Sequence, residues 1–139
     1  MIAALNTKDF IELVGYREWP VVDGWYEKKN GVAVARVKID RETYVGRNIA
    51  IRGRVELLAG CHIGMNCIFD GNMTDTISVG YCSTVGAETR IRYGVKVGKH
   101  AIVGSNCHIE EFANIGDRIH IDSMTRIGVR SRLENIQNF

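Results

Sequence analysis

The chain of 139 residues lacks several features that define other classes of protein. It has no apolar run close to the roughly 20 residues that a transmembrane helix needs, so we expect no membrane span and no membrane partner. The opening stretch "MIAALNTKDF" has no basic segment ahead of its apolar residues and no long apolar core before a cleavage site, unlike a signal peptide. We therefore expect a soluble, cytoplasmic protein.

An excess of charge of one sign is also missing. The 18 Lys and Arg residues are balanced by 16 Asp and Glu, and the two signs are interspersed along the chain. Without a basic tail or block, no segment is suited to bind phosphate backbones, and nucleic acid is not an expected partner. The 4 cysteines have no spacing that indicates a disulfide framework, so we expect free thiols.

What the sequence does contain is an aliphatic residue at every sixth position. In "VGKHAIVGSNCHI", residues 97–109, these positions are Val97, Val103 and Ile109, and the series runs without a gap over residues 79–133. The same spacing fits residues 39–69, with an insertion in residues 70–78 separating the two halves. Glycines often follow the aliphatic residue directly, and small or medium-sized residues stand four positions after it.

A period of six excludes an amphipathic helix, because a repeat of 3.6 residues would place every sixth residue on a drifting face. Alternation along a strand explains it, since residues two apart, such as Ala101 and Val103, then point to the same side. Each hexad becomes a short strand and a bend, and three hexads close a triangular coil of 18 residues. The bends coincide with residues that tolerate left-handed backbone angles: Asn48, Gly60, Asn66, Gly94 and Asn106.

This pattern over residues 39–134 resembles the hexapeptide repeat of acyltransferases that work as trimers. The resemblance implies an all-β fold, namely a single-stranded left-handed parallel β-helix of about five triangular coils. Residues 1–38 lack the hexad and are expected to form a cap, with a short helix from Thr7 through Val14, ended by Gly15, and a β-hairpin around Asn30-Gly31. Residues 135–139 are expected to form a C-terminal tail.

The outward positions divide among three sides of the coil, which differ in charge. What we call the charged face projects Arg52, Asp70, Arg90, Arg92, His108, Glu110 and Arg126 and is expected to be a solvated wall. The polar face projects Glu56, Ser78, Lys96, Asn114, Arg132 and Glu134. The low-charge face projects Tyr44, Gly46, His62, Gly64, Thr84, Gly86, Ile102, Gly104, His120 and Asp122.

Depletion of charge is typical of the core of an interface, so the low-charge face is expected to join copies of the chain. The resemblance implies a homotrimer, and the choice of face follows from its outward residues. We expect the contact to run through Tyr44, His62, Thr84, Ile102 and His120.

The resemblance further implies acetyl-CoA or another acyl-CoA as co-substrate, a small-molecule acceptor, and a histidine general base at the subunit clefts. His62 and His120 lie on the low-charge face, and Asp122 is placed to orient His120, so these three are the candidate catalytic residues. His62 ranks slightly ahead because it lies nearest to the inserted segment. His108 is expected in a surface charge cluster and His100 at a bend.

No metal is expected, because the histidines lack the paired spacing of the metal-binding carbonic anhydrases that share the implied fold. The inserted "GNMTDT" contains no histidine, which keeps a second hypothesis open. In it, the protein is a non-catalytic β-helix that binds a partner through its aromatic cap, around Trp19 and Trp25, or through the charged face. We therefore predict an acyltransferase-like trimer, with the binding protein as the alternative.

Overall fold

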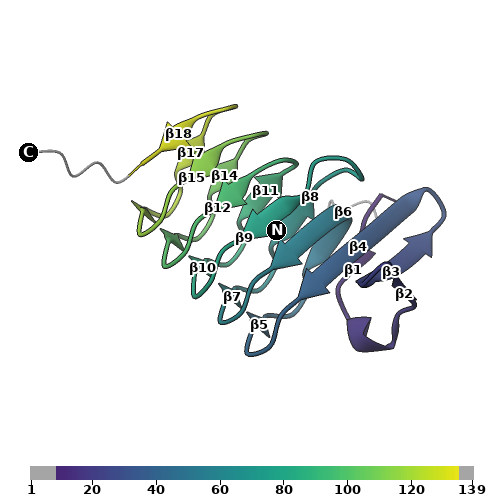
Figure 1. Ribbon diagram of the computed structural model, residues 1–139. Helices are drawn as coiled ribbons and strands as arrows, with labels where there is room; N and C mark the ends of the chain where they lie inside the picture. Colours follow the sequence, from purple (N-terminus) through teal and green to yellow (C-terminus); the bar gives the residue numbers. More distant parts are fainter. Residues whose placement is uncertain (1–8, 135–139) are drawn as a thin grey trace, which may run out of the picture.

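The computed structural model describes residues 9–134, and almost all of its regular structure is β-strand. Short strands stack turn upon turn, and a hairpin covers one end of the stack (Figure 1). The expected left-handed parallel β-helix is confirmed. It makes about six turns where the sequence indicated about five, because the strand that closes the N-terminal hairpin also belongs to the stack.

The three faces inferred from the sequence are three stacks of parallel strands. The low-charge face consists of β5 (Tyr44–Val45), β7 (His62–Ile63), β10 (Thr84–Val85), β13 (Ile102–Val103) and β16 (His120–Ile121). The charged face has the first part of β6 (Ala50–Leu57), then β8 (Ile68–Asp70), β11 (Arg90–Arg92), β14 (His108–Ile109) and β17 (Arg126–Ile127). The polar face has β4 (Ala33–Ile39), the second part of β6, β9 (Ile77–Val79), β12 (Lys96–Val97), β15 (Asn114–Ile115) and β18 (Arg132–Leu133).

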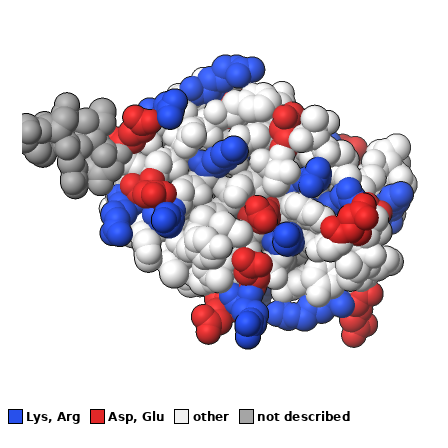
Figure 2. All heavy atoms as spheres, viewed as in Figure 1, with Lys and Arg blue, Asp and Glu red and all other residues white. Residues whose placement is uncertain are grey.

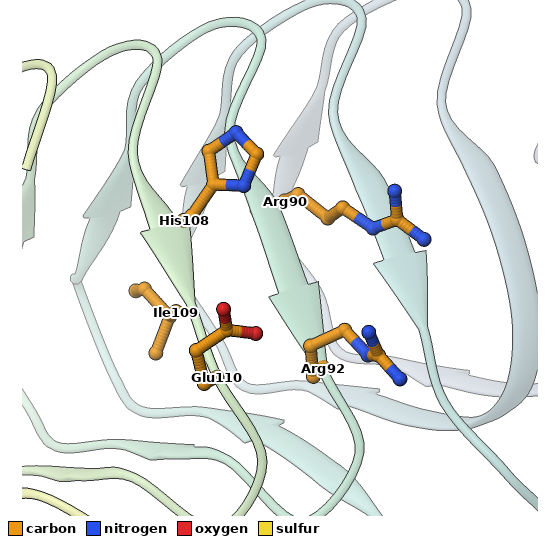
Figure 3. A pocket seen from close by; sticks show the side chains of 5 residues that line it. All are labelled: Arg90, Arg92, His108, Ile109 and Glu110. Atoms are coloured by element: carbon orange, nitrogen blue, oxygen red, sulfur yellow. The ribbon is translucent and has the colours of Figure 1, made fainter. Parts of the chain in front are cut away.

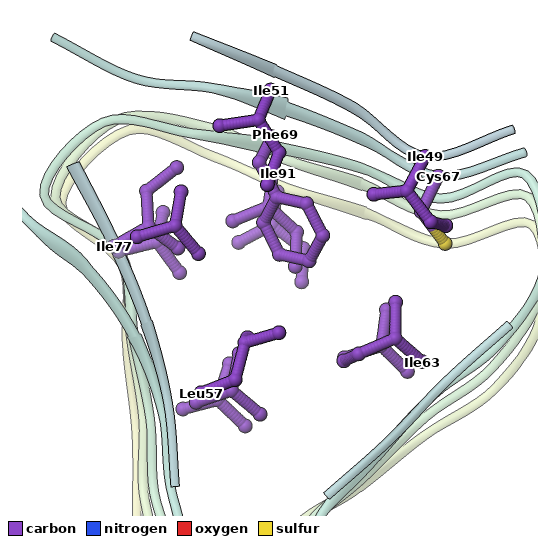
Figure 4. Packing of buried hydrophobic residues seen from close by; sticks show 14 of the residues in the cluster. Ile49, Ile51, Leu57, Ile63, Cys67, Phe69, Ile77 and Ile91 are labelled. Carbon is purple, nitrogen blue, oxygen red and sulfur yellow. The ribbon is translucent and has the colours of Figure 1, made fainter. Parts of the chain in front are cut away.

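The register of these strands explains the period of the sequence. Val97 pairs with Ile115, and Val85 pairs with Val103, so residues one coil apart lie directly above one another. Their side chains fill the interior of the prism, and the walls around it carry stacked aliphatic residues (Figure 4). Phe69 has the largest of the fully buried side chains.

A residue in the left-handed backbone region recurs at the bends. The expected bend residues adopt it, with φ values of 59° at Asn48, 61° at Asn66 and 55° at Asn106. The same angle also occurs at bends without Asn or Gly, as at Phe112 and Arg118. Because a left-handed angle costs such residues roughly 1–2 kcal/mol, the paired strands on both sides must hold these bends in place.

The cap differs from the sequence prediction in its first element. The expected helix through Phe10 and Val14 is wrong: β1 (Ile11–Glu12) is instead an antiparallel strand on β6, while Thr7 lies outside the described residues. Gly15 is left-handed, with φ 61°, and opens a 3₁₀ turn at Tyr16–Glu18 rather than ending a helix. The unpaired edge of β6 explains the difference, since it offers backbone partners that an isolated short helix would not gain.

The expected hairpin is confirmed, with a slight shift of its turn. The strands β3 (Trp25–Asn30) and β4 (Ala33–Ile39) pair antiparallel, and β2 (Val21–Val22) adds to β3. Asn30 pairs with Ala33, so Gly31 and Val32 form the turn. The cap thus covers the charged and polar stacks, and β5 remains the end strand of the low-charge stack.

Candidate functional site on the low-charge face

The low-charge face is a column of outward side chains held in register by its strands. Thr84 pairs with His62 and with Ile102, Ile102 pairs with His120, and Tyr44 pairs with His62. Tyr44 and Ile102 are 59% and 45% exposed, which is high for side chains of their size and polarity. The sequence prediction that these residues share one face is confirmed.

A column of glycines runs beside this column of outward side chains. Gly46, Gly64, Gly86 and Gly104 follow the strands of successive turns. A Cβ atom on Gly86 would lie 2.5 Å from the backbone carbon of Gly104, so only glycine allows the turns to approach this closely. The result is a strip beside the column that carries no side chains.

The His62 side chain contacts a residue that lines a hollow. Its ring lies 4.5 Å from the ring of Tyr44, centroid to centroid, in an edge-to-face arrangement. Tyr44 in turn lines an open groove of about 800 Å³, whose other walls are residues 13–16 of the cap, Val45 of β5, the following Gly46 and Arg47, and Gly64, Met65 and Ala87. The groove is mostly apolar, and Arg47 is the charged residue in its lining.

His120 lies three turns away from His62 in the same column. Its side chain and that of Asp122 are both exposed. The hydrogen bonds and ion pairs found within residues 9–134 include none between His120 and Asp122. The two histidines are therefore separate candidates for a base, and Asp122 as the orienting group stays a prediction.

The charged face is more ordered than a solvated wall. Asp70 on β8, expected to point into water, is only 2% exposed because Arg52 and Arg90 from the neighbouring turns hydrogen-bond to its two carboxylate oxygens. Burial raises the pKa of Asp70, but the hydrogen bonds and charges of these arginines outweigh it, and the pKa lies below its ordinary value. Arg52 and Arg92 align in register with Asp70 on the adjacent turns. The 18-residue period of the coil could have revealed this column of two arginines and one aspartate.

The remaining histidines occupy the places expected for them. His108 pairs in register with Arg90 and Arg126 on the charged face. His100 is at a bend, with φ 54°.

The cysteines are free thiols, as predicted. Cys61, Cys67 and Cys107 are buried, and Cys82 is exposed at a bend. Burial raises the pKa of the Cys61 and Cys67 thiols to about 11. The Cys61 thiol donates a hydrogen bond of 2.9 Å to the carbonyl of Gly80, so it acts as a small core residue rather than a nucleophile.

Across the described residues, no three or more His, Cys, Asp or Glu side chains gather where they would hold a metal ion. The same part of the chain contains no helix with the length and apolarity to cross a membrane. In the view of Figure 2, basic and acidic side chains are mixed over the surface.

The hexad register and the left-handed bend residues describe a parallel β-helix built from six-residue repeats. No family model matches the sequence, and no curated protein matches it either. A solved structure of serine acetyltransferase isoform 3 in complex with cysteine, from Entamoeba histolytica, is similar with a TM-score of 0.32 and 17% sequence identity. The match covers 74% of this chain and 38% of that one.

Proposed function

We propose that the protein is an acyl-CoA-dependent acyltransferase that works as a cyclic homotrimer, with the low-charge face at the subunit contacts. His62 is the general base in this proposal, and His120 with Asp122 is the second candidate. The observation that carries the proposal is the contact between the His62 ring and Tyr44, which links an exposed imidazole to the groove of about 800 Å³.

The chemistry fits what these residues offer. The hydroxyl or amine of an acceptor attacks the thioester carbonyl while the His62 imidazole takes its proton. The acceptor oxygen or nitrogen forms the new bond to the acyl carbon, the bond from that carbon to sulfur breaks, and the leaving sulfur takes the proton from the His62 imidazolium, which releases CoA as a free thiol. The apolar lining of the groove suits the acyl and pantetheine groups, and Arg47 in that lining offers a guanidinium for a CoA phosphate.

Acetyl-CoA is expected to stabilise the protein against heat, because a ligand at 100 times its dissociation constant adds about 2.7 kcal/mol. His62→Ala should keep this stabilisation and lower turnover by about 100-fold, the lower range for loss of a general base. His100→Asn is the matched control, since it removes a histidine from a bend and asparagine tolerates the left-handed angle there. Differential scanning fluorimetry and release of free CoA thiol measure the two effects.

Absence of any shift with acetyl-CoA or CoA would contradict the transferase. Unchanged turnover in His62→Ala together with a loss in His120→Ala would move the base to His120. Unchanged turnover in both variants would remove the histidine assignment altogether.

The trimer has a test of its own. Ile102→Asp places an unpaired charge in the middle of the low-charge face, where a partner subunit would bury it, and a buried unpaired charge is strongly unfavourable. We expect sedimentation velocity at micromolar concentration to show a trimer for the wild type and a monomer for this variant. Asn114→Asp, at the equivalent outward position of β15 on the polar face, should remain a trimer. A monomeric wild type would overturn the assembly.

The alternative is a non-catalytic β-helix that binds a partner through its cap or its charged face. In the cap, the Trp19 side chain is only 8% exposed, and the guanidinium of Arg54 lies over the ring of Trp25 at 4.7 Å. These aromatic residues are engaged in packing within the chain. The alternative therefore rests on the charged face, and absence of any acetyl-CoA effect would favour it.

A further inference from the structure

The groove beside Tyr44 gathers apolar side chains that are exposed to water. Val14, Tyr44 and Met65 all line it, and they are 61%, 59% and 41% exposed. They come from three separate segments, namely the cap, β5 and the turn after β7. Single exposed apolar side chains are common on protein surfaces, but apolar side chains that converge from separate segments mark a binding surface.

The groove extends over three turns at one corner of the prism. Arg47, Met65 and Ala87 occupy equivalent places in these turns, because the strands before them pair in register. Two spacings of about 4.8 Å separate the first place from the third, so the groove is roughly 10 Å long, close to the length of an extended octanoyl chain. The next two turns carry Ser105 and Ser123 at the same place, so the apolar side of this corner ends at Ala87.

A second hollow, on the charged face, has a different character. It has a volume of about 130 Å³ and is lined by Arg90, Arg92, His108, Ile109 and Glu110 (Figure 3). Its charged groups are paired within the chain: Arg90 with Asp70, Arg92 with Glu111, and Glu110 with Arg126. This hollow is small and its charges are already balanced, so it offers little to a ligand.

The groove beside Tyr44 instead contains a charge without a partner. Arg47 is the charged residue of its lining, and the ion pairs found within residues 9–134 do not include Arg47. An occupant that complements the groove therefore combines an apolar part with a negative charge. An acyl-CoA has both, because its acyl chain is apolar and its phosphates are anionic.

We propose that the groove holds the acyl chain of the donor, and that this chain is of medium length, close to octanoyl, rather than acetyl. An acetyl group has one methyl to bury and would leave most of the apolar lining in water, whereas a longer chain covers it. Tyr44 both lines the groove and contacts His62, so a chain whose thioester end rests at Tyr44 has that end on the side of the base. This inference rests on the proposed acyl transfer and names the group that is transferred.

The test measures binding of acetyl-, butanoyl-, hexanoyl- and octanoyl-CoA to the full chain by isothermal titration calorimetry. Burial of one methylene improves binding about fourfold, and half burial in an open groove improves it about twofold. We therefore expect octanoyl-CoA to bind roughly 60-fold more tightly than acetyl-CoA, over the six methylenes by which they differ. Equal dissociation constants along the series overturn the inference and leave the transferase standing.

Variants at the groove test whether the chain lies there. Met65→Gln should weaken octanoyl-CoA binding at least fivefold and acetyl-CoA binding less than twofold. Met73→Gln is the matched control, because Met73 is 39% exposed, lies in the inserted loop and does not line the groove. Equal weakening of octanoyl-CoA by the two variants contradicts the inference.

Ala87→Met shortens the groove from its far end. The turn before already carries methionine at the equivalent place, so the fold accepts this side chain there. We expect butanoyl- or hexanoyl-CoA to bind this variant more tightly than octanoyl-CoA, a change of preference that a loss of stability would not produce. An unchanged preference overturns the inference, and if the variants do not fold, the wild-type series decides.

Free fatty acids separate this inference from the proposed function. Octanoate should shift the methyl resonance of Met65 in the NMR spectrum, and acetate at the same concentration should not. Octanoate binding without binding of any acyl-CoA would keep the acyl site and remove the transferase. Absence of both octanoate and acyl-CoA binding would remove both.

Discussion

Gly86→Ala is expected to lower the free energy of unfolding by about 3 kcal/mol, at the upper end of the usual cost of overpacking. The added Cβ would lie 2.5 Å from the backbone carbon of Gly104 and 2.6 Å from the nitrogen of Ser105. These atoms belong to the next turn, which hydrogen bonds hold in place, including one of 2.8 Å from Gly86 N–H to the Val103 carbonyl. Relief would require separating two turns of the helix. Urea unfolding followed by circular dichroism measures the loss.

Gly128→Ala is the matched control for this substitution. Gly128 occupies the same place in its hexad, but among residues 9–134 its added Cβ would meet only the Ser131 hydroxyl oxygen, at 3.5 Å. We expect a change within about 0.5 kcal/mol, as for ordinary surface substitutions. Similar losses at Gly86 and Gly128 would mean that close stacking of the turns does not explain why glycine follows the strand.

The stack of turns was predictable because it repeats. A wrong repeat length would have assigned side chains to the wrong face. The predicted alignment of Thr84 with His62 and Ile102 is the register that the structure shows. The offset between the two halves was also placed correctly. The extra residues form a loop after β8, in which the side chain of Asn72 accepts hydrogen bonds from the backbone N–H groups of Thr74 and Asp75.

The cap was less predictable, since its structure depends on partners far away in sequence. Residues 10–14 have a pattern compatible with a short helix, but Ile11 pairs with Ile51, forty residues later. Nothing local to the segment signals that pairing. The open edge of β6 in the first turn offers the backbone partners that make the segment a strand.

The candidate sites were likewise predictable where they follow from the repeat and unpredictable where they depend on distant segments. The column that contains His62 followed from the period, whereas the groove beside Tyr44 depends on where residues 13–16 cross the corner of the helix. The burial of Asp70 was missed because alternation assigns it an outward direction, which is correct, but says nothing of arginine side chains folding over it from adjacent turns. On the outside of a β-helix, a side chain can therefore point outward and still be buried by side chains of the adjacent turns.

Phe69→Ala is expected to cost about 3–5 kcal/mol, the range for deleting a buried aromatic side chain. Phe69 is fully buried and lies between Ile51 and Ile91 of the adjacent turns, with Leu57 and Ile63 on the other walls (Figure 4). The cavity left behind would stay open, because the turns above and below are fixed at the spacing of paired strands, about 4.8 Å, and cannot close over it.

The control for Phe69→Ala is Phe112→Ala, which deletes the same ring from a bend. Phe112 lies outside the prism and packs edge-to-face on Tyr93, with ring centroids 5.5 Å apart, a contact worth about 1 kcal/mol. Urea unfolding of both variants should therefore show a loss at least twice as large for Phe69. Comparable losses would indicate that the interior near the insertion relaxes, so that the prism there is held by its backbone ladder rather than by close packing of its side chains.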